Sequence, residues 1–231
     1  EHFSVWTEPA SVCAKPETNA TTTAQEWFMH SHMIPAWQAM LTAAKNDGVT
    51  ITPVSSFRDY ARQQRIFNEK ATGTRAVFDD NEQSLKCTEF SAIDWLQKIL
   101  RFTALPGLSR HHWGTEIDVF NGDAIYQGYK PQLVASEFCK DGPCATLTEW
   151  LNANAKSFGF YRPYQRDLGG VSAEPWHLSY HPLSSVFLTQ IPVERLRQHY
   201  QQYPLVFQAL ITSHLPELME RYVYRITHTT E

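Results

Sequence analysis

Hydrophobic residues recur at helical spacing early in the chain. Between Trp27 and Asn46, large apolar side chains return every three or four residues, which predicts a helix. Pro35 interrupts this pattern and Gly48 follows it, so we expect the helix to bend at the proline and to stop before the glycine. The β-branched run from Val49 to Val54 comes next and is typical of a strand.

Two further helices have recognisable start signals. Asp59 is a good N-cap residue in front of a helical pattern that carries Phe67. Ser91 opens a third helix over about residues 91–102, and Asp94 three positions later gives a start similar to a capping box.

Polar and apolar residues alternate later in the chain. The segment from Ser109 to Phe120 has β character, with a turn expected at Trp113 and Gly114. After this turn, Glu116 and Asp118 alternate with apolar residues, so both carboxylates lie on one face of the predicted strand.

The remaining patterns are mainly helical. Residues 146–157 predict a helix, residues 176–180 a short strand, and residues 193–224 two helices divided near Pro204. We therefore predict an α+β fold in which helices pack on a small antiparallel sheet, with a C-terminal helical extension.

Three parts of the chain are expected. Residues 1–24, rich in Thr, Asn and Pro, predict an irregular N-terminal arm. Residues 25–190 form the main domain, and residues 191–231 form a helical extension that packs on the same domain. A chain of 231 residues is long enough for a full hydrophobic core.

The composition excludes several classes of protein. Hydrophobic residues make up 42% of the chain and charged residues 19%, as in ordinary globular proteins. A net charge of −4 gives no basic surplus for phosphate backbones, so we expect no nucleic-acid partner. No apolar run reaches the roughly 18 residues of a membrane-spanning helix. We expect a monomer.

The cysteines and the first residue of the sequence indicate in which cellular compartment the protein is found. Cys139 and Cys144 flank the turn-forming residues Asp141, Gly142 and Pro143, so we predict a disulfide between them and an oxidising compartment. The alternative is free thiols in a cytosolic protein. The sequence begins with Glu rather than Met, and we expect that an upstream segment has been removed.

Two segments carry candidate metal ligands. A turn at Gly114 would bring His111 and Asp118 to one metal ion, and Glu174 precedes His177 by three residues. A single histidine is more often a structural residue than a ligand, so the whole pattern carries the prediction. Two histidines and an aspartate leave zinc an open position for water, and Glu174 can then act as general base.

This pattern resembles the zinc D-Ala-D-Ala metallopeptidases, which include vancomycin-resistance D,D-carboxypeptidases and dipeptidases and the L,D-carboxypeptidases. The family motif is Ser-x-His-x-x-Gly-x-x-x-Asp followed downstream by Glu-x-x-His. The positions that fill it here are Ser109, His111, Gly114, Asp118, Glu174 and His177. The stretch from Ser55 to Gln63 is similar to the family's Ser-x-x-Arg-x-x-x-x-Gln segment.

The resemblance implies roles for the residues that match. It implies one zinc ion per chain, held by His111, Asp118 and His177, with Glu174 and Arg58 as catalytic residues. Gln63, Ser109 and Trp176 are then expected to contact substrate. For Arg58, the alternative is a surface salt bridge with Asp59 or Glu69.

Two departures from the family pattern concern the substrate groove. Position 116 is Glu where the family commonly has Ala, and the insertion over residues 121–143 has no recognisable motif.

The resemblance implies an enzyme that removes the C-terminal D-Ala from peptidoglycan stem peptides or muropeptides. The bond is either the L,D bond of a tetrapeptide or the D,D bond of a pentapeptide. The alternatives are an endopeptidase of the phage-lysin kind, a D,D-dipeptidase, or a non-catalytic zinc-binding module. We expect a location in the periplasm or cell envelope, with cytoplasmic muropeptide recycling as the alternative.

Overall fold

The computed structural model describes residues 3–7 and 26–228, and the chain forms two compact units. Unit 1 comprises the described parts of Glu1–Phe57, Trp113–Tyr161 and Pro175–His181. Unit 2 comprises Arg58–His112, Arg162–Glu174 and the described part of Pro182–Glu231. Each unit is therefore assembled from stretches that are separate in the sequence.

A four-stranded antiparallel sheet is the centre of unit 1. Its strand order is β3 (Ile51–Ser55), β6 (Glu116–Asn121), β8 (His177–Tyr180) and β7 (Phe160–Tyr161). The first five residues of β6 are all buried, so this strand is covered on both faces. The predicted α+β class with a small antiparallel sheet is confirmed.

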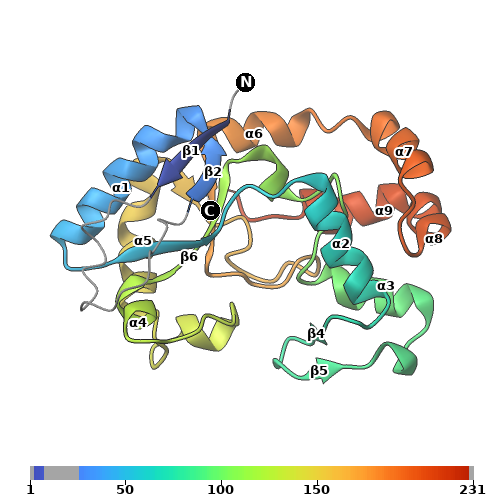
Figure 1. Ribbon diagram of the computed structural model, residues 1–231, viewed down its shortest axis with the longest axis horizontal. Helices are drawn as coiled ribbons and strands as arrows, with labels where there is room; N and C mark the ends of the chain where they lie inside the picture. The colour runs from blue at the N-terminus through green and yellow to red at the C-terminus, as the bar shows by residue number, and fades with distance from the viewer. Residues whose placement is uncertain (1–2, 8–25, 229–231) are drawn as a thin grey trace, which may run out of the picture. The chain divides into compact units, whose positions relative to one another are not determined.

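The segment before the first long helix differs from the prediction. Residues 26–30 form strand β2 (Glu26–His30), which pairs with β1 (Phe3–Thr7). A 3-10 turn follows, and helix α1 covers Ile34–Asn46 with its proline in the first turn (Figure 1). The helix predicted from Trp27 was therefore wrong in its first part, because Pro35 suits a helix start, where its missing N–H is not needed. β1 also lies within the stretch expected to be an irregular arm, and most of that stretch lies outside the described residues.

Apolar side chains from α1 and the sheet form the core of unit 1. Helix α1 buries Trp37, Met40 and Ala44 at the helical spacing of three and four residues. They belong to one cluster with Ile117 of β6 and Leu178 of β8. Helices α4 (Gly122–Tyr126) and α5 (Ala145–Asn154) complete the regular helices of this unit.

Unit 2 begins with the two helices whose start signals the sequence shows. In α2 (Tyr60–Ala71), the Asp59 carboxylate accepts a hydrogen bond of 2.7 Å from the backbone N–H of Arg62. In α3 (Ala92–Leu100), Ser91 Oγ accepts one of 3.3 Å from the N–H of Asp94. Both predicted caps are confirmed. The short hairpin of β4 (Val77–Phe78) and β5 (Ser84–Leu85) follows α2, and β4 contacts α3 (Figure 1).

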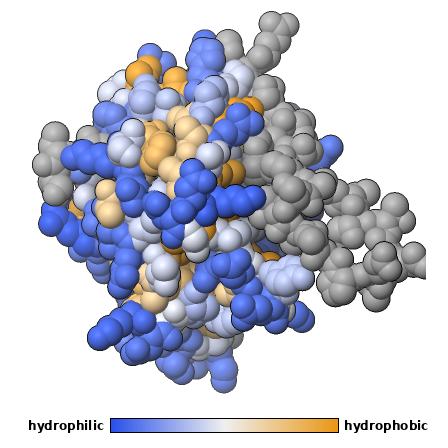
Figure 2. Space-filling view, turned by 90° about the vertical axis from the view of Figure 1, so that its left-hand side faces the viewer, coloured by the Kyte–Doolittle hydropathy of each residue, from blue (hydrophilic) through white to orange (hydrophobic). Residues whose placement is uncertain are grey.

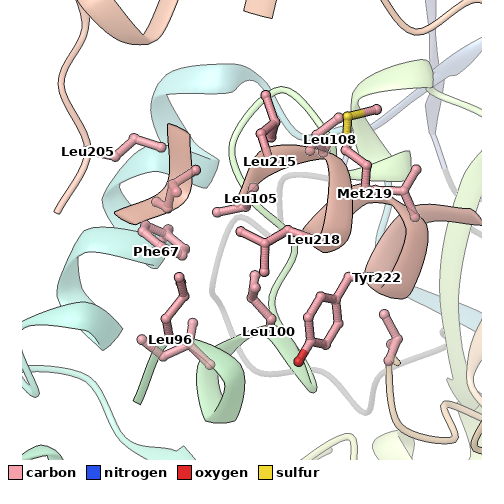
Figure 3. Packing of buried hydrophobic residues seen from close by; sticks show 14 of the residues in the cluster. Phe67, Leu96, Leu100, Leu105, Leu108, Leu205, Leu215, Leu218, Met219 and Tyr222 are labelled. Carbon is pink, nitrogen blue, oxygen red and sulfur yellow. The ribbon is translucent and has the colours of Figure 1, made fainter. Parts of the chain in front are cut away.

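The C-terminal part of the chain contains more helical pieces than predicted. They are α6 (His181–Thr189), α7 (Val193–Gln202), α8 (Gln208–Ser213), α9 (Leu215–Met219) and a π-helical turn at Glu220–Tyr224. In Figure 3, side chains from α2, α3 and this region point toward one another, with Phe67, Leu100 and Leu218 among them. The C-terminal helices thus supply much of the core of unit 2. Whether they are an extension of a domain over residues 25–190 stays a prediction.

The predicted disulfide between Cys139 and Cys144 is wrong, because both cysteines are free. The segment Ala135–Phe138 forms a 3-10 helix, and the exposed Cys139 thiol donates to the carbonyl of Ala135 over 3.4 Å. Cys144 instead lies fully buried in the core of unit 1. The turn between the two cysteines therefore points their side chains to different environments.

Within residues 3–7 and 26–228, no helix is long and apolar enough to cross a membrane. On the face that Figure 2 shows, polar residues are interspersed with small apolar patches.

Candidate metal centre and active site

The register of two strands in unit 1 places four polar side chains on one face. Glu116 of β6 is paired with Ser179 of β8, and Asp118 is paired with His177. Residues two apart on a strand point the same way, so each strand contributes two of these side chains to the same face. All four residues are buried. The prediction that Glu116 and Asp118 share a face is confirmed.

His111 belongs to a short 3-10 helix, Arg110–Trp113, where the sequence predicted a strand. Gly114 follows with φ of 70°, a left-handed conformation that glycine adopts without strain, and so turns the chain into β6. The predicted turn is thus present, although the residues before it are helical.

The three predicted metal ligands lie together. His111, Asp118 and His177 each offer one ligand atom, these atoms are within 4.8 Å of one another, and all three residues are buried. Two imidazoles and a carboxylate are the donor set of catalytic zinc sites, which keep a fourth position for water or substrate. The residues therefore fit a zinc ion.

Both ring nitrogens of His177 face a carboxylate. Nδ1 is 3.0 Å from Oδ1 of Asp118, and Nε2 is 2.8 Å from Oε2 of Glu116. Burial lowers the pKa of His177, but hydrogen bonds to the two carboxylates and their charges outweigh this and raise it to about 10 in the metal-free chain. A metal ligand must be a neutral imidazole, so metal binding displaces a proton from this ring.

In unit 2, the polar side chain of Gln63 holds Arg58. The amide oxygen of Gln63 accepts a hydrogen bond of 2.7 Å from Arg58 Nη1, and its amide nitrogen donates one of 2.7 Å to the carbonyl of Ala104. Gln63 is fully buried. Its bond to Ala104 fixes the amide, and the amide in turn fixes the guanidinium of Arg58. A direct contact of Gln63 with substrate stays a prediction.

His112 has a structural role beside the candidate ligand. Its Nε2 accepts a hydrogen bond of 3.0 Å from the N–H of Gly107, so Nδ1 carries the proton and donates to the carbonyl of Arg58 over 2.6 Å. Burial lowers the pKa of His112 to about 4, which keeps the ring neutral. The backbone N–H of Arg58 also donates to the carbonyl of His111 over 3.1 Å. Arg58 is therefore held through both its backbone and its side chain.

The two other predicted substrate contacts are buried. Ser109 is 3% exposed, and its carbonyl accepts the N–H of His112 over 3.0 Å. Trp176 packs in the core of unit 1 against Phe138, and its carbonyl accepts the N–H of Val119. The structure gives Trp176 a packing role, and contacts of either residue with substrate stay predictions.

Glu174 is buried in unit 2, and its backbone N–H donates to the carbonyl of Tyr164 over 2.8 Å. Its charge acts on Lys70, a residue that the sequence analysis missed. Lys70 donates to Thr103 Oγ1 over 2.7 Å. It follows Gln63 by seven residues on α2, so helical periodicity places the two on the same side of that helix. This spacing is the signal that could have found it.

Lys70 has an unusually low pKa. Burial lowers it most, the charges of Arg75 and Arg58 lower it further, Glu174 opposes them, and the result is about 8 against an ordinary value of 10.5. Between these two values the folded chain binds fewer protons than the unfolded chain, so its stability rises with pH. Below about 8, the buried ammonium group destabilises the fold in full.

We therefore expect Lys70→Met to stabilise the protein near pH 7 by on the order of 1 kcal/mol, allowing for solvent screening. The gain should shrink as the pH rises from about 8 through 10.5 and should vanish only well above 10.5, where the lysine is neutral in both states. Urea unfolding at pH 7 and at pH 10 measures it, with the exposed Lys45→Met as control. A gain that is equal at both pH values would contradict the assignment.

The fold and the buried group of candidate ligands indicate to which class of protein the chain belongs. Two histidines and an aspartate, of which Asp118 and His177 lie on a small antiparallel sheet, form the donor set of metal-dependent hydrolases. Residues 26–183 match the model of the VanY family, D-alanyl-D-alanine carboxypeptidase. This match covers more than half of the chain, so the chain belongs to that family of peptidases. The resemblance inferred from the motifs is confirmed.

Individual relatives agree with the family. An uncharacterised protein of Haemophilus influenzae is 35% identical over 117 residues, which cover 50% of this chain and 89% of that protein. A D-alanyl-D-alanine carboxypeptidase of Enterococcus faecalis is 31% identical over 149 residues, 63% of this chain and 46% of the relative. A second Haemophilus protein is matched over 58% of its length. The chain thus spans about half of the length of several relatives.

Two solved structures show the same fold. VanYB in complex with D-alanine-D-alanine has a TM-score of 0.50 and 22% identity, over 87% of this chain and 92% of that one. The LD-carboxypeptidase LdcB has a TM-score of 0.50 and 21% identity, over 89% of this chain and 74% of that one.

Proposed function

We propose that the protein is a zinc-dependent carboxypeptidase that removes the C-terminal D-Ala from peptidoglycan stem peptides. The observation that carries the proposal is the buried group of His111, Asp118 and His177 in a chain of the VanY family. The solved relatives support the substrate class, since VanYB was solved with D-alanine-D-alanine and LdcB is an LD-carboxypeptidase. The reaction then belongs to the cell envelope or to muropeptide recycling.

Bound zinc supplies the Lewis acidity that polarises the scissile carbonyl and makes water a better nucleophile near neutral pH. Glu174 takes the proton from the attacking water and later delivers it to the leaving amine, as a general base that becomes a general acid. Arg58 stays charged at working pH and stabilises negative charge on the carbonyl oxygen. Its bonds to Gln63 fix the guanidinium before substrate arrives, so little reorganisation is needed during the reaction.

The decisive assay uses a tetrapeptide, a pentapeptide and the amidated form of the preferred one, each with and without a chelator. We expect release of a single D-Ala, loss of activity in chelator and recovery with zinc. Amidation should lower the rate at least about tenfold, because buried donors that would bind a terminal carboxylate are left unpaired.

Product lengths from mass spectrometry distinguish the alternatives. Full activity in chelator would overturn the zinc proposal. Equal cleavage of the amidated peptide would indicate an endopeptidase, and dipeptide products would indicate a dipeptidase. No cleavage of any peptide by the zinc-loaded protein would leave a non-catalytic zinc-binding module.

A further inference from the structure

Glu116 is a fully buried carboxylate that the proposed mechanism does not use. Its Oε1 accepts hydrogen bonds from Ser179 Oγ over 2.8 Å and from Thr115 Oγ1 over 3.0 Å, and its Oε2 lies 2.8 Å from Nε2 of His177. A buried charge is costly unless hydrogen bonds satisfy it, and here each oxygen has a partner. The carboxylate of Glu116 is thus held in one position by its hydrogen bonds.

The strand register explains how Glu116 reaches the imidazole. Asp118 is directly across from His177, while Glu116 is two residues earlier on β6 and so lies diagonally across the strand pair. Diagonal neighbours on one face of a sheet are within reach of long side chains. Glutamate has this length, as the 2.8 Å between its Oε2 and Nε2 of His177 shows.

Each of the two ring nitrogens of His177 faces a different carboxylate, that of Asp118 or that of Glu116. Nδ1 faces Asp118, which is itself a candidate ligand, and Nε2 faces Glu116, which is not in the metal group. A metal held by Asp118 and His177 would therefore bind Nδ1, and the remaining proton would then lie on Nε2, toward Glu116.

We propose that Glu116 is a positioning residue: its carboxylate holds Nε2 of His177 and thereby presents Nδ1 to the metal. This inference rests on the proposed zinc site and adds to it a residue outside the group of three candidate ligands. A carboxylate behind a ligating histidine fixes the orientation and tautomer of the ring and makes it a stronger ligand. Removing such a partner typically weakens metal binding by 10- to 100-fold.

The test compares zinc affinity of Glu116→Ala, Glu116→Gln and the wild type, by competition with a chromophoric chelator at fixed pH. We expect Glu116→Ala to raise the zinc Kd by about 10- to 100-fold. Glu116→Gln should lie between the two, because its amide oxygen still accepts the Nε2 proton but carries no charge. The control is Glu137→Gln, which alters another buried glutamate of unit 1, one that instead binds the backbone of Gln132 and Val134.

A second measurement does not depend on the variants folding. In the zinc-loaded wild type, ¹⁵N NMR of the histidine side chains should show His177 protonated at Nε2 and bound to zinc through Nδ1. The opposite tautomer would overturn the inference, as would variants with wild-type zinc affinity. If the wild type binds no zinc, the proposed function fails as well. Zinc binding with the opposite tautomer, or with unchanged variant affinities, removes only the role of Glu116.

Discussion

Replacing Glu174 by glutamine should leave zinc binding intact and lower kcat by about 10²- to 10⁴-fold, the usual contribution of a general base. Glutamine keeps the size of the side chain but cannot take a proton from water. Glu174 lies outside the group of three candidate ligands, so its replacement should not change the zinc affinity. The expected signature is therefore a large loss of turnover in a protein that still carries zinc.

Steady-state kinetics and metal analysis on the same sample measure both quantities. The control is again Glu137→Gln, which removes a buried carboxylate that lies outside the metal group. A parallel loss of zinc and activity in Glu174→Gln would make Glu174 a ligand. Unchanged turnover would remove it from the mechanism.

Replacing Asp118 by alanine should have the opposite signature, with loss of the metal and of activity together. Asp118 offers one of the three ligand atoms, and its Oδ1 lies 3.0 Å from Nδ1 of His177. Because loss of a residue behind a ligand already costs 10- to 100-fold in affinity, loss of a ligand should cost more than about 100-fold. Activity at low zinc should then be undetectable.

The exposed Asp123→Ala on α4 is the control, since it removes a carboxylate that is not in the metal group. Zinc titration followed by calorimetry gives the affinities. If Asp118→Ala binds zinc as tightly as the wild type, the metal group is not the one formed by His111, Asp118 and His177.

Features that depend on nearby residues were predictable from the sequence. The caps of α2 and α3 need only Asp59 and Ser91 and the helical patterns after them, and both are present. The group of candidate metal ligands could be predicted because the spacing of its members around Gly114 is a chemical pattern.

Features that depend on distant partners were not predictable. Strand β2 forms because residues 26–30 pair with β1, and an apolar pattern alone does not distinguish such a strand from the start of a helix. The contact of Glu116 with His177 depends on the register of β6 and β8, which no local signal reports. The burial of Lys70 and the inward turn of Cys144 likewise follow from packing.

Strands β6 and β8, which carry two of the three candidate ligands, would also link metal binding to folding. Asp118 and His177 are 59 positions apart in the sequence, so the unfolded chain must close a long loop before the two can meet. Under the proposed function, zinc would consequently bind the folded chain in preference to the unfolded one. At a free zinc concentration one hundred times its Kd, such selective binding stabilises the native state by about 2.7 kcal/mol. The catalytic ion would then also act as a thermodynamic clamp across β6 and β8, and zinc depletion would expose the chain to unfolding as well as inactivate it.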